Sequence, residues 1–315
     1  MASPPIAAPR HPIEPDSGYL LQLKAKRITG RVLTYAALLL VCAVIGAPMF
    51  WMLTAAFKSN PEVYTFPPIW WPELLRWTSV SDAGDAWVNF REAWNKAPFD
   101  RWYLNSVIIT VAGMSLEIVN STMTAYALAF LKFKYKNLVF ILILAALMVP
   151  AQVTILPNYL LIGKYADQYL GINGVNTYWG IVIPGASVAY GTFLLRQSFL
   201  GLPREVMEAA RIDGAGHLRM LWDIVLPMAR PVLVTFALIS LVAKWNDYLW
   251  PLIVTNEERM RPLTVGIAAF FNNEGNTNWG VVMAAVIYVI APLLVIYLWA
   301  QRYIIEGITA GATKG

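Results

Sequence analysis

Six of the polar side chains within two largely apolar stretches of the sequence have types that could bind a solute or one another. The stretch 102–131 contains Glu117, Asn120 and Ser121, and the stretch 231–256 contains Lys244, Asn246 and Asp247. A charge near the centre of a bilayer costs roughly 2.5–3.5 kcal/mol, so such residues usually face a bundle interior or a watery cavity. Carboxylate, ammonium and amide groups suit a hydroxyl-rich solute, and we therefore place these six residues along a substrate pathway.

The charges of Glu117 and Lys244 allow three arrangements. Each residue lies near the middle of its apolar stretch, so the two charges could pair across the bundle or share a water-filled cavity. Lys244 could instead pair with Asp247 three residues further along its own helix. The small and hydroxyl residues around Glu117 share one helix face, which is also typical of helix–helix packing.

A second constellation lies in the segment 201–231, between two apolar stretches. Residues 204–212 have good helix formers, Asp213 and Gly214 interrupt them, and an apolar face recurs from His217 onward at helical spacing. The sequence therefore predicts two short helices joined by a glycine hinge. Without further information, they could equally be interfacial helices that lie on a membrane.

The chemistry that the sequence lacks is also informative. One cysteine, Cys42, excludes an internal disulfide and a cysteine-based zinc site, and the two histidines, His11 and His217, have no metal-ligand spacing. There is no G-x-x-x-x-G-K-[ST] phosphate loop and no grouping of a nucleophile with a histidine and an acid. We expect no catalytic residue, no metal and no enzyme activity in this chain, so energy for any transport must come from a partner or a gradient.

The elements that hold these residues are predicted to be membrane-spanning helices. Of the 315 residues, 58% are hydrophobic and 14% are charged, against roughly 25% charged in an ordinary soluble domain. A span takes about 20 apolar residues, and six stretches are long enough. They are 32–57, 102–131, 137–162, 168–195, 231–256 and 275–301.

The segments outside these stretches predict the topology. The proline-rich residues 1–30 are expected to form a disordered tail, ahead of a membrane domain over residues 31–315 that includes a tryptophan-rich outer loop at 58–103. With the N-terminus inside, fifteen Lys and Arg residues fall on the inner side and eight on the outer side. The positive-inside rule therefore places both termini in the cytoplasm, and the net charge of +5 needs no nucleic-acid partner.

The segment 201–231 resembles the EAA loop of bacterial ABC importer permeases. The similarity rests on Glu208-Ala209-Ala210, Asp213-Gly214-Ala215, Ile224, Leu226-Pro227 and Pro231 at fixed spacing between two spans. Outside the loop, the motifs resemble the carbohydrate-uptake branch that includes maltose-type permeases. These motifs are Asn89-Phe90, Asn105-Ser106, Ala125–Ala129, Trp245–Pro251, Gly307–Gly311 and Lys314-Gly315.

This resemblance implies a type I ABC importer permease fold with six transmembrane helices and cytoplasmic coupling helices, in a bacterial inner or plasma membrane. It implies a second homologous permease, two ATPase subunits that bind ATP and Mg²⁺, an extracytoplasmic solute-binding protein, and a sugar or polyol substrate. This chain itself would bind no cofactor. The residues that the resemblance assigns to ATPase coupling are Glu208, Ala209, Ala210, Asp213, Gly214, Ala215, Leu226 and Pro227.

Two other functions compete with an ATP-driven sugar or polyol importer that works by alternating access. A self-sufficient secondary transporter or channel for a small polar solute would be expected to show internal repeats, and the first three stretches do not convincingly repeat in the last three. An intramembrane enzyme would need a catalytic constellation, which the sequence lacks.

Overall fold

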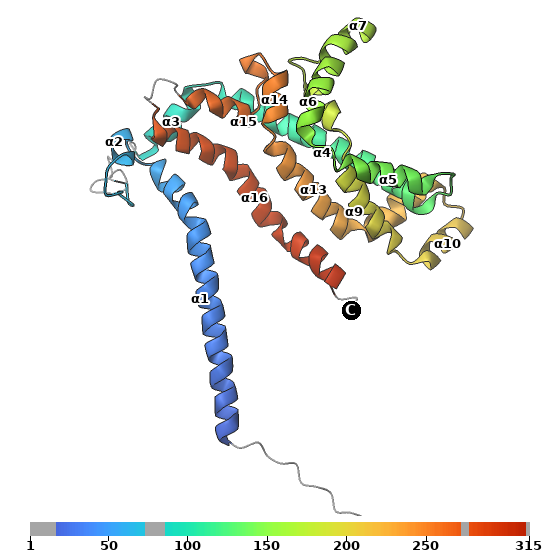
Figure 1. Ribbon diagram of the computed structural model, residues 1–315, viewed down its shortest axis with the longest axis horizontal. Coiled ribbons are helices and arrows are strands. Elements are labelled where there is room, and N and C mark those ends of the chain that lie inside the picture. Colours follow the sequence, from blue (N-terminus) through green and yellow to red (C-terminus); the bar gives the residue numbers. More distant parts are fainter. Residues whose placement is uncertain (1–16, 73–85, 272–276, 313–315) are drawn as a thin grey trace, which may run out of the picture. The chain divides into compact units, whose positions relative to one another are not determined.

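The computed structural model describes residues 17–72, 86–271 and 277–312 (Figure 1), and every regular element in these ranges is helical. The elements fall into two compact units, residues 1–54 and residues 55–315. The helices with eight or more residues are α1 (Ser17–Ala55), α3 (Val88–Asn95), α4 (Phe99–Phe130), α5 (Lys136–Ala146), α6 (Ala151–Leu160), α9 (Ala189–Leu200), α10 (Arg204–Ile212), α13 (Arg230–Trp245) and α16 (Trp279–Ala312).

The first unit consists of α1 up to Thr54. Its portion Lys26–Ala55 is long and apolar enough to cross a membrane, with a mean hydropathy of 2.3. We predicted a disordered tail over residues 1–30, but the helix begins at Ser17. The prediction was therefore wrong for residues 17–30, and residues 1–16 lie outside the described part of the chain.

Two further helices cross as continuous spans, as the apolar stretches predicted. These are α4, with a mean hydropathy of 1.4, and the portion Trp279–Gln301 of α16, with a mean hydropathy of 2.7. Both have more than 18 residues, so backbone hydrogen bonds can be satisfied within each helix across the bilayer core.

The remaining three candidate spans are bent helix pairs. The bends are 98° between Lys136–Ala146 and Ala151–Leu170, 49° between Tyr178–Gly185 and Ala189–Leu200, and 86° between His217–Met228 and Arg230–Trp245. Counting each pair as one span gives six, in agreement with the predicted number.

The boundaries of these three spans differ from the prediction. The stretch 137–162 was expected to be one helix but turns sharply after Ala146, where Pro150 precedes α6. The stretch 168–195 was placed too early, because α7 (Ala166–Leu170) ends before α8 (Tyr178–Val182) begins. The stretch 231–256 breaks between α13 and the short α14 (Leu249–Val254).

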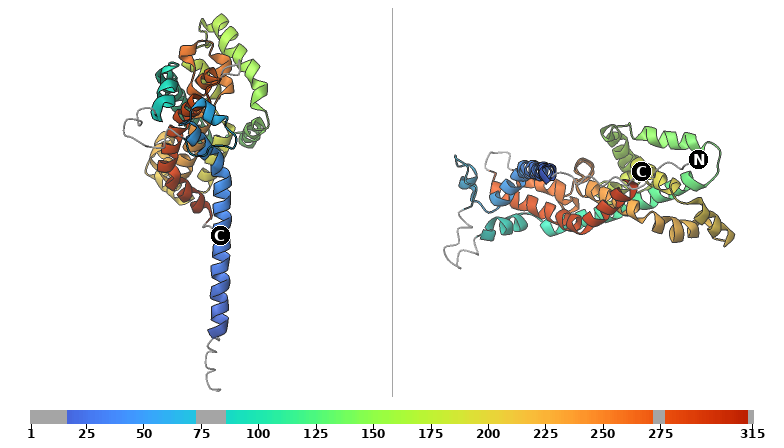
Figure 2. Two further views of the ribbon diagram at one scale, coloured as in Figure 1. Left: turned by 90° about the vertical axis from the view of Figure 1, so that its left-hand side faces the viewer. Right: turned by 90° about the horizontal axis from the view of Figure 1, so that it is seen from below.

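The second unit packs around α4, which contacts both α9 and α13 (Figure 1). Gly191 of α9 permits a close approach, because a Cβ there would overlap the ring of Phe236 on α13. Figure 2 shows α16 from two further sides, and it packs along α13 and α3. The central position of α4 explains why its polar face is buried: Ser106, Thr110, Glu117 and Ser121 are all buried.

The segment that follows α14 is bound to the first turns of α4. Asn105 donates through Nδ2 to the carbonyls of Arg259 and Arg261 at 2.8 and 2.9 Å, and Trp102 Nε1 donates to the carbonyl of Glu258 at 2.9 Å. Trp102 is fully buried, although it was one of six tryptophans in the predicted outer loop. It is therefore a core residue at the start of α4.

Candidate functional site

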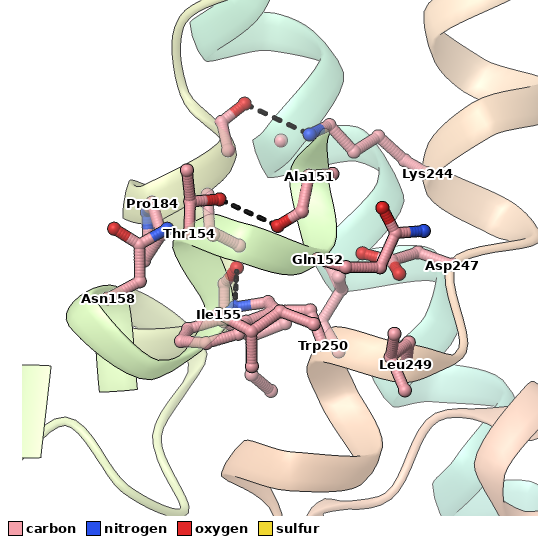
Figure 3. Close-up of a pocket in the computed structure, with 15 residues that line it drawn as sticks. Ala151, Gln152, Thr154, Ile155, Asn158, Pro184, Lys244, Asp247, Leu249 and Trp250 are labelled. Carbon is pink, nitrogen blue, oxygen red and sulfur yellow. Dashed lines mark hydrogen bonds between the residues drawn. The ribbon is translucent and has the colours of Figure 1, made fainter. Parts of the chain in front are cut away.

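A cavity of about 320 Å³ opens between α4, α6, α8, α13 and α14 (Figure 3). Its lining comes from four separate parts of the chain, and its polar side chains come from residues 152–158 and 244–250. The lining residues are Ile109, Gly113, Ala151, Gln152, Thr154, Ile155, Asn158, Ile181, Val182, Pro184, Gly185, Lys244, Asp247, Leu249 and Trp250.

Lys244 links this cavity to a buried ion pair with Glu117. The distance from Lys244 Nζ to Glu117 Oε1 is 2.7 Å, and the side chains are 18% and 5% exposed respectively. Ser240 Oγ donates a hydrogen bond to Glu117 Oε2. Of the arrangements that the sequence allowed for Lys244, the structure shows the pair across α4 and α13.

Three polar side chains of α4 and α13 donate to backbone carbonyls at the bend of the fourth span, between Tyr178–Gly185 and Ala189–Leu200. A break frees carbonyls that a continuous helix would pair internally, and in a membrane each of them needs another donor. Lys244 Nζ donates to the carbonyl of Gly185 at 2.9 Å, Asn120 Nδ2 to that of Ala186 at 2.8 Å, and Ser121 Oγ to that of Val188 at 3.5 Å. Donors from α4 and α13 thus hold the bend between α8 and α9.

The six residues that we placed along a substrate pathway therefore occupy different positions. Lys244 and Asp247 line the cavity. Glu117 and Ser121 are buried behind it, and Asn120 is bound to the break. Asn246, which follows the last residue of α13, donates through Nδ2 to the carbonyl of Val242 in that helix at 2.8 Å.

Sequence reasoning missed four side chains that line the cavity: Gln152, Thr154, Asn158 and Trp250. The first three lie in the stretch 137–162, which was treated as uniformly apolar because it has no charge. The signal was present, since amide and hydroxyl groups also have to find partners within a membrane.

The segment 204–228 has the predicted form of two helices with a hinge. The first, α10, covers Arg204–Ile212, and the second comprises α11 (His217–Met220), η5 (Leu221–Val225) and α12 (Leu226–Met228). Gly214 has φ +78°, a left-handed conformation that favours glycine.

Some of the residues that the resemblance assigns to ATPase coupling are exposed and others are buried. The N–H of Ala215 donates to the carbonyl of Ala210 at 2.9 Å, which closes the end of α10. Glu208, Ala209, Asp213 and Gly214 are exposed, whereas Ala210 and Leu226 are buried. A hollow of about 360 Å³ lies beside the hinge, and its lining includes Ala209, Ala210, Asp213 and Ala215.

The second hinge helix is anchored to the end of α4. The hydroxyl of Tyr126 on α4 lies 3.1 Å from Nδ1 of His217 and 3.4 Å from the sulfur of Met220. Met220, Leu221 and Val225 are buried with Tyr126 in one apolar cluster. A displacement of the hinge would therefore act on α4, which also carries Glu117.

Comparison with known proteins identifies the family. Residues 118–309 match the family described as "Binding-protein-dependent transport system inner membrane component". The chain belongs to this family. It is accordingly the permease subunit of an ABC importer and a multi-pass protein of the inner membrane, and the hinge and the cavity are parts of a transporter.

Curated relatives of the permease cover most of its length. The sn-glycerol-3-phosphate transport system permease protein UgpE of Yersinia enterocolitica is 33% identical over 88% of this chain and 95% of that protein. The arabinooligosaccharides transport system permease protein AraQ of Halalkalibacterium halodurans is 36% identical over 68% of this chain and 74% of that protein.

A solved structure resembles the permease in fold. A chain in the crystal structure of a bacterial ABC transporter involved in the import of the acidic polysaccharide alginate matches with a TM-score of 0.72 and 23% sequence identity. The match covers 89% of this chain and 97% of that chain. The bent spans described above therefore belong to a known importer fold.

Proposed function

We propose that this permease moves a sugar or polyol into the cell by alternating access, together with a second homologous permease and two copies of an ATPase subunit. An extracytoplasmic solute-binding protein would deliver the solute. The relatives named for an arabinooligosaccharide and for glycerol 3-phosphate support a small polyhydroxy substrate. The cavity supports it too, because its hydroxyl and amide groups can hydrogen-bond such a solute.

The permease needs no cofactor of its own in this proposal. ATP and Mg²⁺ would be held by the ATPase subunits on the cytoplasmic side. The two helices and the hinge of residues 204–228 would contact these subunits there. Both termini would then be cytoplasmic, in agreement with the excess of Lys and Arg on that side.

The observation that carries the coupling role is the geometry of the hinge. Glu208 is exposed on a nine-residue helix, and the following helix is fixed to α4 through Tyr126. An ATPase that seats α10 could therefore rock the hinge and transmit its closure through α11 to α4. Switching between inward- and outward-facing states by rigid movement of helices is a known mode of conformational change.

The test is ATP-driven uptake by the assembled complex in proteoliposomes, with glycerol and arabinotriose among the solutes offered. Glu208→Lys reverses the charge presented to the ATPase, and Gly214→Pro imposes a negative φ where the hinge has φ +78°. Each variant is expected to insert normally but to lose most of its transport. Asp167→Lys on α7 is the control, because it makes the same charge change away from the hinge.

Wild-type transport by both hinge variants, with normal ATP hydrolysis, would refute the coupling role. Uptake by the permease without any ATPase would instead favour a self-sufficient transporter.

A further inference from the structure

The charges that line the cavity are unequally paired. The ammonium of Lys244 is bound to the Glu117 carboxylate at 2.7 Å and to the Gly185 carbonyl at 2.9 Å. Asp247 forms no ion pair within the part of the chain that the structure describes. Lys244 acts on it only at longer range, and the backbone N–H groups of Tyr248 and Trp250 also stabilise its charge. The cavity with its adjoining pair thus carries one positive and two negative charges.

The other polar groups of the lining are neutral and have hydrogen-bonding capacity to spare. Gln152 is exposed and Asn158 is partly exposed, and within the described ranges neither side-chain amide has a hydrogen-bond partner in the chain. Thr154 Oγ1 donates to the carbonyl of Ala151 at 2.8 Å, which leaves its lone pairs available as acceptors. Trp250 Nε1 donates to the carbonyl of Ile181 at 3.1 Å, so the indole offers an apolar ring to the cavity.

We propose that this cavity takes an uncharged polyhydroxy solute and disfavours anionic ones, with the Asp247 carboxylate as the group that discriminates. This inference rests on the proposed function and narrows its substrate class. Amide and carboxylate acceptors bind neutral hydroxyl groups, and the ring of Trp250 can pack on the apolar face of a sugar. A phosphate or uronate group would meet Asp247 without an unpaired cation to compensate it.

The proposal separates this permease from two of the proteins that it resembles. The relative from Yersinia enterocolitica is named for sn-glycerol 3-phosphate, and the structural neighbour is named for the acidic polysaccharide alginate. Both named solutes are anions. A shared fold does not transfer a substrate, because selectivity depends on the groups at the site.

The charge of the cavity can be measured without knowing the solute. In the assembled transporter with Cys42→Ser, the variant Gln152→Cys places one thiol in the cavity lining. Its reaction rates are measured with three methanethiosulfonate reagents: cationic trimethylammonium-ethyl, anionic sulfonatoethyl and neutral hydroxyethyl. Each rate is divided by the rate for a free small thiol, so that only the local potential remains.

We expect the normalised cation-to-anion rate ratio to exceed that of the free thiol about tenfold, as for a unit charge several ångströms away in a wet site. Adding Asp247→Asn should bring the ratio close to that of the free thiol. Asp167→Asn removes the same charge from the other end of the helical segment Ala151–Leu170 and should leave the ratio at Gln152→Cys unchanged, because about 1.5 Å per residue separates the two positions by roughly 20 Å.

A ratio that stays the same when Asp247 is neutralised would overturn the proposal, as would a ratio that favours the anion. If neither Gln152→Cys nor a second probe, Asn158→Cys, reacts with the neutral reagent, the cavity is closed to solutes and the proposal is equally wrong. None of these rates depends on ATP or on uptake. Failure of this inference is therefore distinguishable from failure of the proposed function.

Discussion

Removing the positive charge of Lys244 should destabilise the permease strongly, because Glu117 would stay buried without its cation. Deleting one partner of a buried ion pair costs about 3–5 kcal/mol. The side chain of Glu117 is only 5% exposed, so solvent can compensate little of this loss. Lys244→Met keeps the length of the side chain and removes its charge, and we expect a loss of about 3–5 kcal/mol in the free energy of unfolding.

The double variant Glu117→Gln/Lys244→Met should be more stable than Lys244→Met alone. It leaves no unpaired charge, so the remaining loss comes mainly from the Gly185 carbonyl, which no longer has its donor. A buried polar group without a partner costs about 1–3 kcal/mol, and Gly185 is only partly buried, so this loss should not exceed that range. The second substitution should therefore restore about 2 kcal/mol or more.

The measurement is unfolding of the purified permease in mixed micelles by titration with dodecyl sulfate, followed by fluorescence of its 13 tryptophans. Lys164→Met, which removes an exposed lysine from the π-helical turn after α6, serves as the control and should change stability little. If Glu117→Gln adds a further loss to Lys244→Met instead of restoring stability, the pair does not stabilise the fold and the reasoning fails.

A pair of charge swaps tests the partner of Lys244. Glu117→Lys/Lys244→Glu should recover part of what each single change loses, because the opposite charges still meet. Lys244→Asp/Asp247→Lys should recover little, because the described structure joins Lys244 to Glu117. The opposite pattern would show that the local pair with Asp247 is the one that matters.

Two more predictions concern topology and packing. In a Cys42→Ser background, a cysteine at Glu257 should react with an impermeant thiol reagent in cells whose outer surface is accessible, and one at His217 should not; the reverse result would overturn the proposed orientation. Gly191→Val should destabilise the permease by about 1–3 kcal/mol or more in the same unfolding titration, because its Cβ would overlap the ring of Phe236. Gly46→Val, where a Cβ meets nothing within 4 Å, is the control.

The sequence predicts the hinge well and the bent spans poorly. The first hinge helix was expected at residues 204–212 and is found there, because Pro203 and Gly214 limit it locally. The bend after Gly185 could not be read in the same way. This bend is bound by donors from Lys244, Asn120 and Ser121. Because these residues lie far from Gly185 in the sequence, a local sequence pattern does not show that they bind there.

The sequence also predicts some residues of the candidate site and misses others. Charge alone was enough to single out Glu117, Lys244 and Asp247 in the sequence, and two of these line the cavity while the third pairs with Lys244. Gln152 and Asn158 were overlooked because a hydropathy reading gives little weight to an amide within an apolar stretch. Only the 98° turn after α5 shows that they face the same space as Asp247.

The long separation of Glu117 from Lys244 has a consequence for biosynthesis. The two residues are 127 positions apart, and a ribosome that adds about 5–20 residues per second needs roughly 6–25 s to make the intervening chain. Glu117 therefore exists for several seconds before its cation has been made. The nascent carboxylate must be hydrated or neutralised by something else, such as the insertion machinery. The carbonyl of Gly185 also has to wait for Lys244 as its donor, so the order of synthesis delays the completion of this site until most of the protein has been made.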